Sequence, residues 1–213
     1  GHTGAADLAT VEVFDPVGDV WTTGTSTPQA RSGIGAATGG YGKVFSIGGS
    51  FNNGGGSTGL VEAYNPATGA WSDVASLDHN RYAIRVVTAS NGRIYAIGGV
   101  TGSNQQGVVF NEEYNPATDT WTTRAPMPTL RWGVGLAATS DGLIYAIGGN
   151  RDGCPCQLDA VEVYDVFTDT WTALPPMPSP RGNVRVEVGT NGLIYAMGGQ
   201  ASSGPELPTV EVY

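Results

Sequence analysis

A period of fifty residues runs without insertion or deletion through most of this chain of 213 residues. Four tryptophans and four Gly-Gly pairs keep this step: Trp21, Trp71, Trp121 and Trp171, and the pairs that begin at Gly48, Gly98, Gly148 and Gly198. Self-similarity at about 50 residues, with several short strands in each unit, is typical of a propeller in which each repeat forms one blade. The period predicts an all-β propeller of about four four-stranded blades, either a whole ring or part of a larger one.

Each repeat carries the signals of four short strands. An apolar run follows a repeated arginine, a second run ends at the glycine pair, a third alternates as in Val61-Glu62-Ala63-Tyr64, and a fourth begins at the tryptophan. The dipeptide Asn91-Gly92 and its counterparts predict a two-residue hairpin between the first and second strands. Segments such as Asn65-Pro66 predict the reversal before the tryptophan. No helical periodicity is present, so we expect almost no helix.

Taken together, these elements resemble the kelch repeat. The resemblance rests on the glycine pair, on Glu62-Ala63-Tyr64-Asn65-Pro66 with Trp71 after it, on Met127-Pro128, and on the arginine that opens the next unit. It implies a single kelch β-propeller over residues 1–213, with units at about 31–80, 81–130, 131–180 and 181–213 and two N-terminal strands within 9–25.

Closure of the ring is the open question. Kelch rings generally have six or seven blades, so we expect an incomplete ring, a fragment, or a chain that closes by association with other segments or copies; the alternative is a compact four-bladed ring. The third-strand pattern occurs five times and the others four times. The strands near 184–199 could therefore pair with the N-terminal hairpin, which would leave the last third-strand copy surplus. The chain also begins inside a loop, as if cut or processed.

Residues repeated identically in every unit are expected to build the framework. The tryptophans and tyrosines fill the wedge between adjacent sheets, and the glycine pairs allow close backbone approach rather than cradle a phosphate. The repeated arginines, Arg31, Arg81, Arg131 and Arg181, are expected to bond carbonyls or carboxylates of a neighbouring blade.

Ligand binding is expected where the repeats differ, because loops that vary on a rigid scaffold commonly carry function. In kelch proteins the partner-binding face is commonly made by the loops between the second and third strands together with the residue after the repeated arginine. Trp132 follows Arg131 and breaks the period, so it is a candidate for stacking on a sugar or anchoring a peptide; the alternative is one more filler between blades. The candidate ligand-binding residues are Ser32, Tyr82, Trp132, Phe51, Asn52, Asn104, Gln105, Arg151 and Asp152.

Charged residues in the first strand form a second anomaly. Arg85, Arg185 and Glu187 stand where sister repeats have Gly or Ala. They either line a water-filled central channel or pair across blades with no functional meaning.

Cys154 and Cys156 flank Pro155 and are the only cysteines. A disulfide between them, or bonds to another chain, is more consistent with the sequence than zinc, because the two histidines lie elsewhere along the chain. We expect no metal and no cofactor.

The charge balance points away from nucleic acid. Nineteen acidic residues against ten basic ones give a net charge of −9, whereas binding phosphate backbones calls for a basic surface. No apolar stretch approaches the ~20 residues of a membrane span. This composition is typical of a secreted or surface protein from a bacterium, so we expect an extracellular or cell-surface location.

Three kinds of function remain open. The first is a non-catalytic interaction or structural module that binds protein or glycan through the variable loops. The second is a carbohydrate-active enzyme, for which the acids that fall outside the repeat pattern would be needed: Asp152, Asp159, Glu187 and Glu206. The third is a self-assembling extracellular subunit, in which an exposed strand adds to the open sheet of the next copy.

Overall fold

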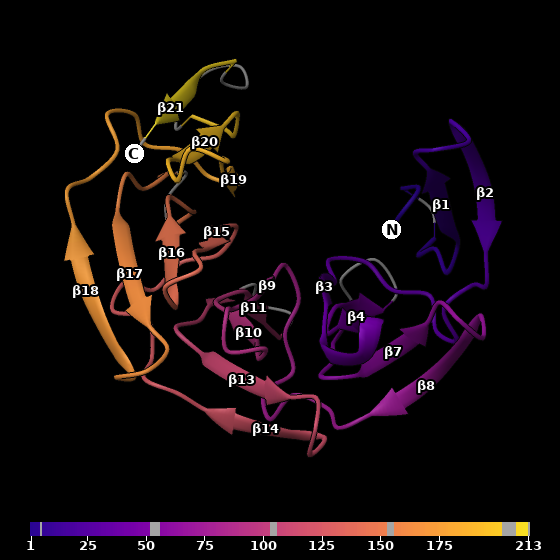
Figure 1. Ribbon diagram of the computed structural model, residues 1–213. Helices are drawn as coiled ribbons and strands as arrows, with labels where there is room; N and C mark the ends of the chain where they lie inside the picture. The colour runs from indigo at the N-terminus through magenta and orange to yellow at the C-terminus, as the bar shows by residue number, and fades with distance from the viewer. Residues whose placement is uncertain (5, 52–55, 103–105, 153–155, 202–207, 213) are drawn as a thin grey trace.

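The computed structural model describes residues 1–4, 6–51, 56–102, 106–152, 156–201 and 208–212, which form an open arc of antiparallel sheets (Figure 1). Three sheets have four strands each, a fourth has three, and a two-stranded hairpin stands at the N-terminal end. The expectation of an all-β propeller is confirmed. Instead of four four-stranded blades, the described residues form three four-stranded blades, one three-stranded blade and the N-terminal hairpin.

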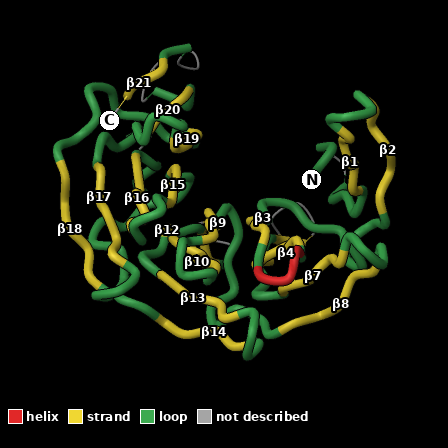
Figure 2. Tube along the Cα trace, in the orientation of Figure 1, coloured by secondary structure: helices red, strands yellow, loops and turns green. Residues whose placement is uncertain are grey.

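Figure 2 shows strands joined by loops, with one short helical turn, η1 (Gly40–Gly42). The N-terminal hairpin comprises β1 (Val11–Asp15) and β2 (Val20–Gly24), and the first blade β3 (Gly35–Thr38), β4 (Val44–Ile47), β7 (Val61–Asn65) and β8 (Ala70–Val74). The second blade comprises β9 (Arg85–Thr88), β10 (Ile94–Ile97), β13 (Asn111–Asn115) and β14 (Thr120–Thr123). The third comprises β15 (Gly135–Ala138), β16 (Leu143–Ile147), β17 (Val161–Asp165) and β18 (Thr170–Leu174), and the three-stranded blade β19 (Arg185–Val188), β20 (Ile194–Met197) and β21 (Val210–Val212). Two short ladders lie in loops: β5 (Ser50–Phe51) with β6 (Gly56–Ser57), and β11 (Val100–Thr101) with β12 (Gln106–Gly107).

The turns between strands follow from residue chemistry. In the reversal between β7 and β8, the Asn65 side chain accepts the backbone N–H of Ala67 at 3.0 Å, as expected of an Asx turn. The hairpin between β9 and β10 differs from its prediction. The Gly92 N–H donates to the Ala89 carbonyl and only Gly92 has a positive φ, 74°, so the loop has three residues rather than two.

Core packing occurs between adjacent blades. The inner faces carry small and β-branched side chains, and the tyrosine of each third strand packs against the tryptophan of the fourth, as between Tyr114 and Trp121 with ring centroids 5.0 Å apart. The Trp121 Nε1–H donates to the Ala75 carbonyl of the preceding blade at 2.7 Å, and Trp71 and Trp171 make the same bond to Thr25 and Ala125. The tryptophans therefore join blades.

The glycine pairs also join blades. Gly48 and Gly49 have φ values of 62° and 110°, and the Gly49 N–H donates to the Arg81 carbonyl of the next repeat at 2.9 Å. A Cβ at Gly48 would lie 2.7 Å from that same carbonyl oxygen. Only glycine fits this approach, as the sequence predicts.

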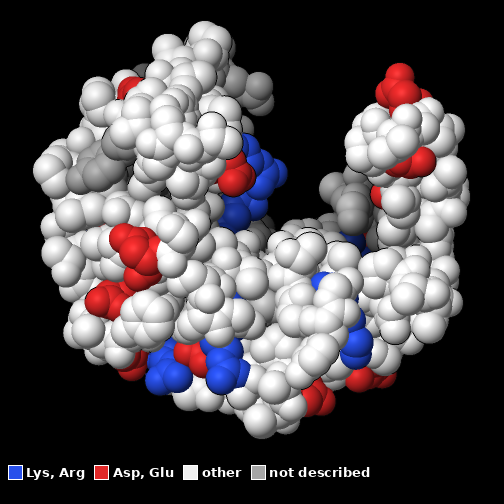
Figure 3. Space-filling model, viewed as in Figure 1, with Lys and Arg blue, Asp and Glu red and all other residues white. Residues whose placement is uncertain are grey.

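The expected pairing between the C-terminal strands and the N-terminal hairpin is wrong in this structure. β20 pairs with β21, with Ala196 opposite Glu211, so the last third-strand copy is used and not surplus. β1 and β2 pair only with each other among the described strands. The hairpin and the three-stranded blade form the two ends of the arc, and Figure 3 shows the opening between them.

Candidate functional site

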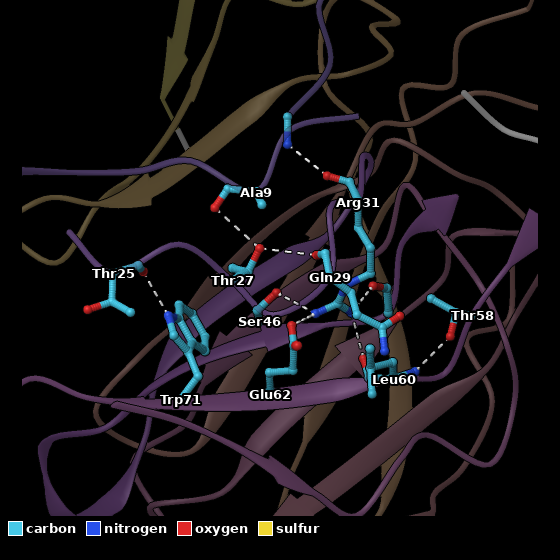
Figure 4. A network of polar contacts seen from close by, with 12 residues as sticks. Ala9, Thr25, Thr27, Gln29, Arg31, Ser46, Thr58, Leu60, Glu62 and Trp71 are labelled. Carbon is cyan, nitrogen blue, oxygen red and sulfur yellow. Dashed lines mark hydrogen bonds and ion pairs between the residues drawn. The ribbon is translucent and has the colours of Figure 1, made fainter. Parts of the chain in front are cut away.

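The side chain of each repeated arginine is buried and forms hydrogen bonds within its own blade. Arg31 donates to the carbonyls of Gly48 at 2.6 Å and Leu60 at 2.9 Å, to the Ser46 hydroxyl, and to the Glu62 carboxylate (Figure 4). The same bond to the third-strand carboxylate recurs in the other blades, in the pairs Arg81–Glu112, Arg131–Glu162 and Arg181–Glu211. The predicted partner types are correct, but they belong to the same blade and not to a neighbour, because the guanidinium bonds the second and third strands of its own repeat.

Burial lowers the pKa of three of these guanidinium groups, those of Arg31, Arg81 and Arg131, and the paired carboxylate opposes that effect. The pKa of Arg81 falls to about 10, and those of Arg31 and Arg131 fall for the same reason. Each arginine is fixed by several acceptors at once, so the residue that follows it in the chain has a fixed position.

That following residue lies on what we call the variable face. In each repeat it forms a two-hydrogen-bond bridge with the first residue after the glycine pair, as Trp132 does with Asn150 at N···O distances of 3.1 and 2.7 Å. The backbone geometry repeats while the side chains differ. The four bridges are Ser32–Ser50, Tyr82–Val100, Trp132–Asn150 and Gly182–Gln200.

Trp132 and its partner Asn150 are the most distinctive pair on this face. Trp132 is partly exposed, whereas Asn150 is buried and its amide packs above Gly133 and Gly182. A Cβ at Gly182 would lie 2.0 Å from the Asn150 Oδ1, so glycine at 182 makes room for this side chain. The pattern of differences between repeats identifies Trp132, but the contribution of Asn150 and Gly182 has no signal in the sequence beyond their variability.

Tyr82 occupies the equivalent position one blade earlier. Its ring packs over Gly33 of the preceding blade, and burial raises the pKa of its phenol. Ser32, one blade before that, places its hydroxyl 3.2 Å from the hydroxyl of Ser50. The variable face therefore runs from small hydroxyl groups to aromatic rings.

The predicted loop residues have different environments. Phe51 is half-buried in β5, and Arg151 is exposed. Asp152 accepts a hydrogen bond from the Gly107 N–H of the preceding blade at 2.6 Å, so its carboxylate connects two loops. Asn52, Asn104, Gln105 and Cys154 lie outside the described residues, whereas Cys156 is disulfide-bonded.

The carboxylates of the described residues are mostly engaged in the framework. Glu113 accepts hydrogen bonds from Arg124 Nε at 2.9 Å and from the Tyr95 hydroxyl at 2.8 Å. The bond between Arg124 and Glu113 raises the pKa of Arg124. Of the off-pattern acids, Asp152 joins loops, Glu187 is exposed on β19, and Glu206 lies outside the described residues. Within the described ranges, no three His, Cys, Asp or Glu side chains lie close enough together to hold a metal ion. No helix in that part of the chain is long and apolar enough to cross a membrane.

The three predicted channel residues lie on the inner strands of the arc. Arg85 is half-buried on β9 and donates from Nε to the Val134 carbonyl of the next blade at 2.9 Å. Arg185 and Glu187 are exposed on β19. Figure 3 shows basic side chains inside the opening of the arc.

An apolar groove of 470 Å³ separates the N-terminal hairpin from the first blade. Val13 and Phe14 line it from β1, and Ile34, Val44 and Phe45 from the first blade. The sequence gives no sign of this groove, because it depends on which strands stand beside β1.

The kelch motif matches three segments, residues 30–77, 85–128 and 136–178, which together make up more than half of the chain. A search of curated proteins with this chain found no match. Among solved structures, the one titled "Structure of YjhT" superposes with a TM-score of 0.74 at 18% identity, over 92% of this chain and 73% of that one. That likeness concerns the fold.

Proposed function

Because the chain belongs to the family of kelch-motif proteins, we propose that it is a non-catalytic binding module that holds a segment of a partner protein on the variable face. The observation that carries the proposal is the series of four bridges with identical backbone geometry and unlike side chains. A rigid frame with varied side chains binds a partner without the cost of ordering loops. We place the protein outside the cell or on its surface, on the basis of its acidic, lysine-poor composition.

Trp132 is the anchor in this proposal. A partly exposed tryptophan held by a bridged backbone offers a large contact area with little loss of side-chain entropy, and tryptophan is enriched among residues that dominate binding energy. Tyr82 on the neighbouring blade provides a second aromatic group, and Asn150 packs against Gly133 and Gly182 beside Trp132.

The test is selection followed by substitution. A displayed library of random peptides is selected on the immobilised protein, and the Kd of each enriched peptide is measured by surface plasmon resonance. Trp132→Ala should weaken binding by about 30-fold, which corresponds to ~2 kcal/mol. Trp21→Ala is the matched control, because Trp21 is 67% exposed on the hairpin, away from this face.

Three outcomes contradict the proposal. If the enriched peptides bind the Trp132→Ala protein as tightly as the parent protein, the variable face is not the binding site. Binding to arrayed oligosaccharides, with no peptide enriched, would replace the protein partner with a glycan. Turnover of a sugar substrate would favour the carbohydrate-active enzyme instead.

Self-association is a second candidate, favoured by one observation. The sequence Val11-Glu12-Val13 on β1 repeats Val210-Glu211-Val212 on β21, and Glu211 pairs with Arg181 at 2.7 Å while Glu12 forms no ion pair among the described residues. In this arrangement β1 of a second copy takes the place of β21 beside β20. Light scattering after size-exclusion chromatography should then show a dimer or larger species that Glu12→Lys weakens, and a monomer at all concentrations would exclude it.

A further inference from the structure

Arginine and glycine alternate at one position of the inner strands. The equivalent residues of the four blades are Gly35, Arg85, Gly135 and Arg185. A Cβ at Gly35 would lie 2.2 Å from Val86 of the next blade, and one at Gly135 would lie 2.2 Å from Val186. The glycines are therefore required by close packing between blades, whereas the arginines stand where the neighbouring surface leaves space.

In the part of the chain that the structure describes, these two arginines have no negatively charged partner. Within the same residues, six of the ten basic residues form ion pairs: Arg31, Arg81, Arg93, Arg124, Arg131 and Arg181. Among the described residues, Arg85 and Arg185 form none, although the protein has nineteen acidic residues. Arg85 uses only its Nε, in the bond to Val134, and the Arg185 side chain makes no hydrogen bond in the part of the chain that the structure describes.

The two arginines stand on either side of β15, the inner strand of the third blade. Arg85 reaches across to the Val134 carbonyl, and a Cβ at the adjoining Gly135 would lie 3.1 Å from Val184 and 2.2 Å from Val186, the chain neighbours of Arg185. Burial lowers the pKa of Arg85, and the positive charge of Arg185 lowers it further. Like charges placed together without a counter-charge destabilise a protein, so their juxtaposition has a cost that a bound anion would remove. Glu187 projects from β19 at a two-residue spacing from Arg185, on the same side of that strand, and forms no ion pair with it among the described residues.

We propose that Arg85 and Arg185 form a binding site for a small organic anion with two carboxylate groups, on the inner wall of the arc. Guanidinium groups present paired N–H donors that match the two oxygens of a carboxylate. The free Nη groups of Arg85 and the whole guanidinium of Arg185 belong to different blades, so a ligand with two charged ends satisfies both. The site is separate from the variable face, and it stands or falls independently of the proposed function.

Succinate is the probe, titrated into protein labelled with ¹⁵N-arginine at constant ionic strength, with the Nε–H resonances followed by NMR. The Arg85 and Arg185 resonances should shift and saturate together, and those of the buried Arg31, Arg81 and Arg131 should stay. Arg185→Gln should weaken succinate binding on the order of tenfold or more, since hydrogen bonds between charged groups are the strong ones. Arg185 is exposed and its side chain makes no hydrogen bond or ion pair among the described residues, so this variant is expected to fold.

Lys43→Gln is the matched control, because Lys43 is also unpaired among the described residues and lies on the first blade. Its substitution removes the same charge and should leave succinate binding unchanged. Equal weakening in Lys43→Gln and Arg185→Gln would reduce the effect to net charge and overturn the proposal. Tighter binding of sulfate than of succinate would overturn the assignment to a dicarboxylate.

Discussion

Replacement of Arg131 by methionine should destabilise the third blade strongly. The Arg131 side chain is fully buried and donates to the Ala146 carbonyl at 2.9 Å, to the Ala160 carbonyl at 3.1 Å and to the Glu162 carboxylate at 2.9 Å. Methionine occupies a similar volume but leaves the carboxylate buried without a counter-charge. That defect costs roughly 3–5 kcal/mol, and the two abandoned carbonyls add about 1 kcal/mol or more.

The expected loss of about 4–6 kcal/mol is comparable to the whole stability of many domains. Arg124→Met is the control, because Arg124 also pairs with a carboxylate at 2.9 Å but is 34% exposed. Its loss should cost under about 1 kcal/mol. Urea unfolding followed by tryptophan fluorescence and circular dichroism measures both, and hydrogen exchange at the amides of β16 and β17 localises the damage.

A second variant separates the buried charge from the loss of packing. Arg131→Met combined with Glu162→Leu removes both charges, so the double variant should be more stable than Arg131→Met alone. If Arg131→Met unfolds within about 1 kcal/mol of Arg124→Met, or if the double variant is the less stable of the two, the argument from an uncompensated buried carboxylate is refuted.

Three further predictions concern the framework. Trp121→Phe should cost about 1–2 kcal/mol in urea unfolding, because the Ala75 carbonyl loses its donor, whereas Trp21→Phe should cost almost nothing; equal costs would contradict a role in joining blades. Ala83→Gly should increase the free energy of unfolding by on the order of 1 kcal/mol and raise the melting temperature, because glycine adopts the φ of 50° at this position without strain. Ala36→Gly in β3 should lower the melting temperature. Destabilisation by both variants would contradict backbone strain at Ala83. Burial raises the folded-state pKa of Tyr95, Tyr114 and Tyr164 above the value in the unfolded chain. Folding therefore favours the protonated phenols, and the protein should lose stability as the pH rises above about 10. Phenolate absorbance should show these three tyrosines titrating only as the chain unfolds, and their titration in the folded protein would contradict the prediction.

The framework could be predicted from the sequence because each of its parts repeats. The inner strands begin one residue from their expected start, as β9 does at Arg85, and the glycine pairs have the predicted structural role. Three of the four repeated tryptophans also join blades as predicted, whereas Trp21 is exposed on the N-terminal hairpin. A repeat imposes the same local geometry four times, so a weak signal in one unit is reinforced by the others.

The pairing at the ends of the arc could not be predicted in the same way. Val11-Glu12-Val13 and Val210-Glu211-Val212 carry the same strand signal, and both suit the edge of β20. Local pattern does not distinguish two nearly identical strands that compete for one edge.

The partners of long side chains are a second feature that was not predicted correctly from the sequence. The repeated arginines reach the third strand of their own blade, across a separation of 31 residues in three of the four pairs. That constant offset is present in the sequence and could have identified Glu62, Glu112 and Glu162 as the partners. The groove beside β1 and the approach of Arg85 to Arg185 depend on how blades pack, and no local pattern encodes them.

The central claim, that the variable face binds a partner through Trp132, is tested most directly by ¹⁹F NMR of protein in which all five tryptophans carry fluorine. The peptide with the lowest Kd from the selection is titrated into it, and each resonance is assigned by Trp→Phe substitution. The account predicts that the Trp132 resonance shifts and saturates while those of Trp21, Trp71, Trp121 and Trp171 remain in place. A saturating peptide that shifts any of those four and leaves Trp132 unmoved would contradict it.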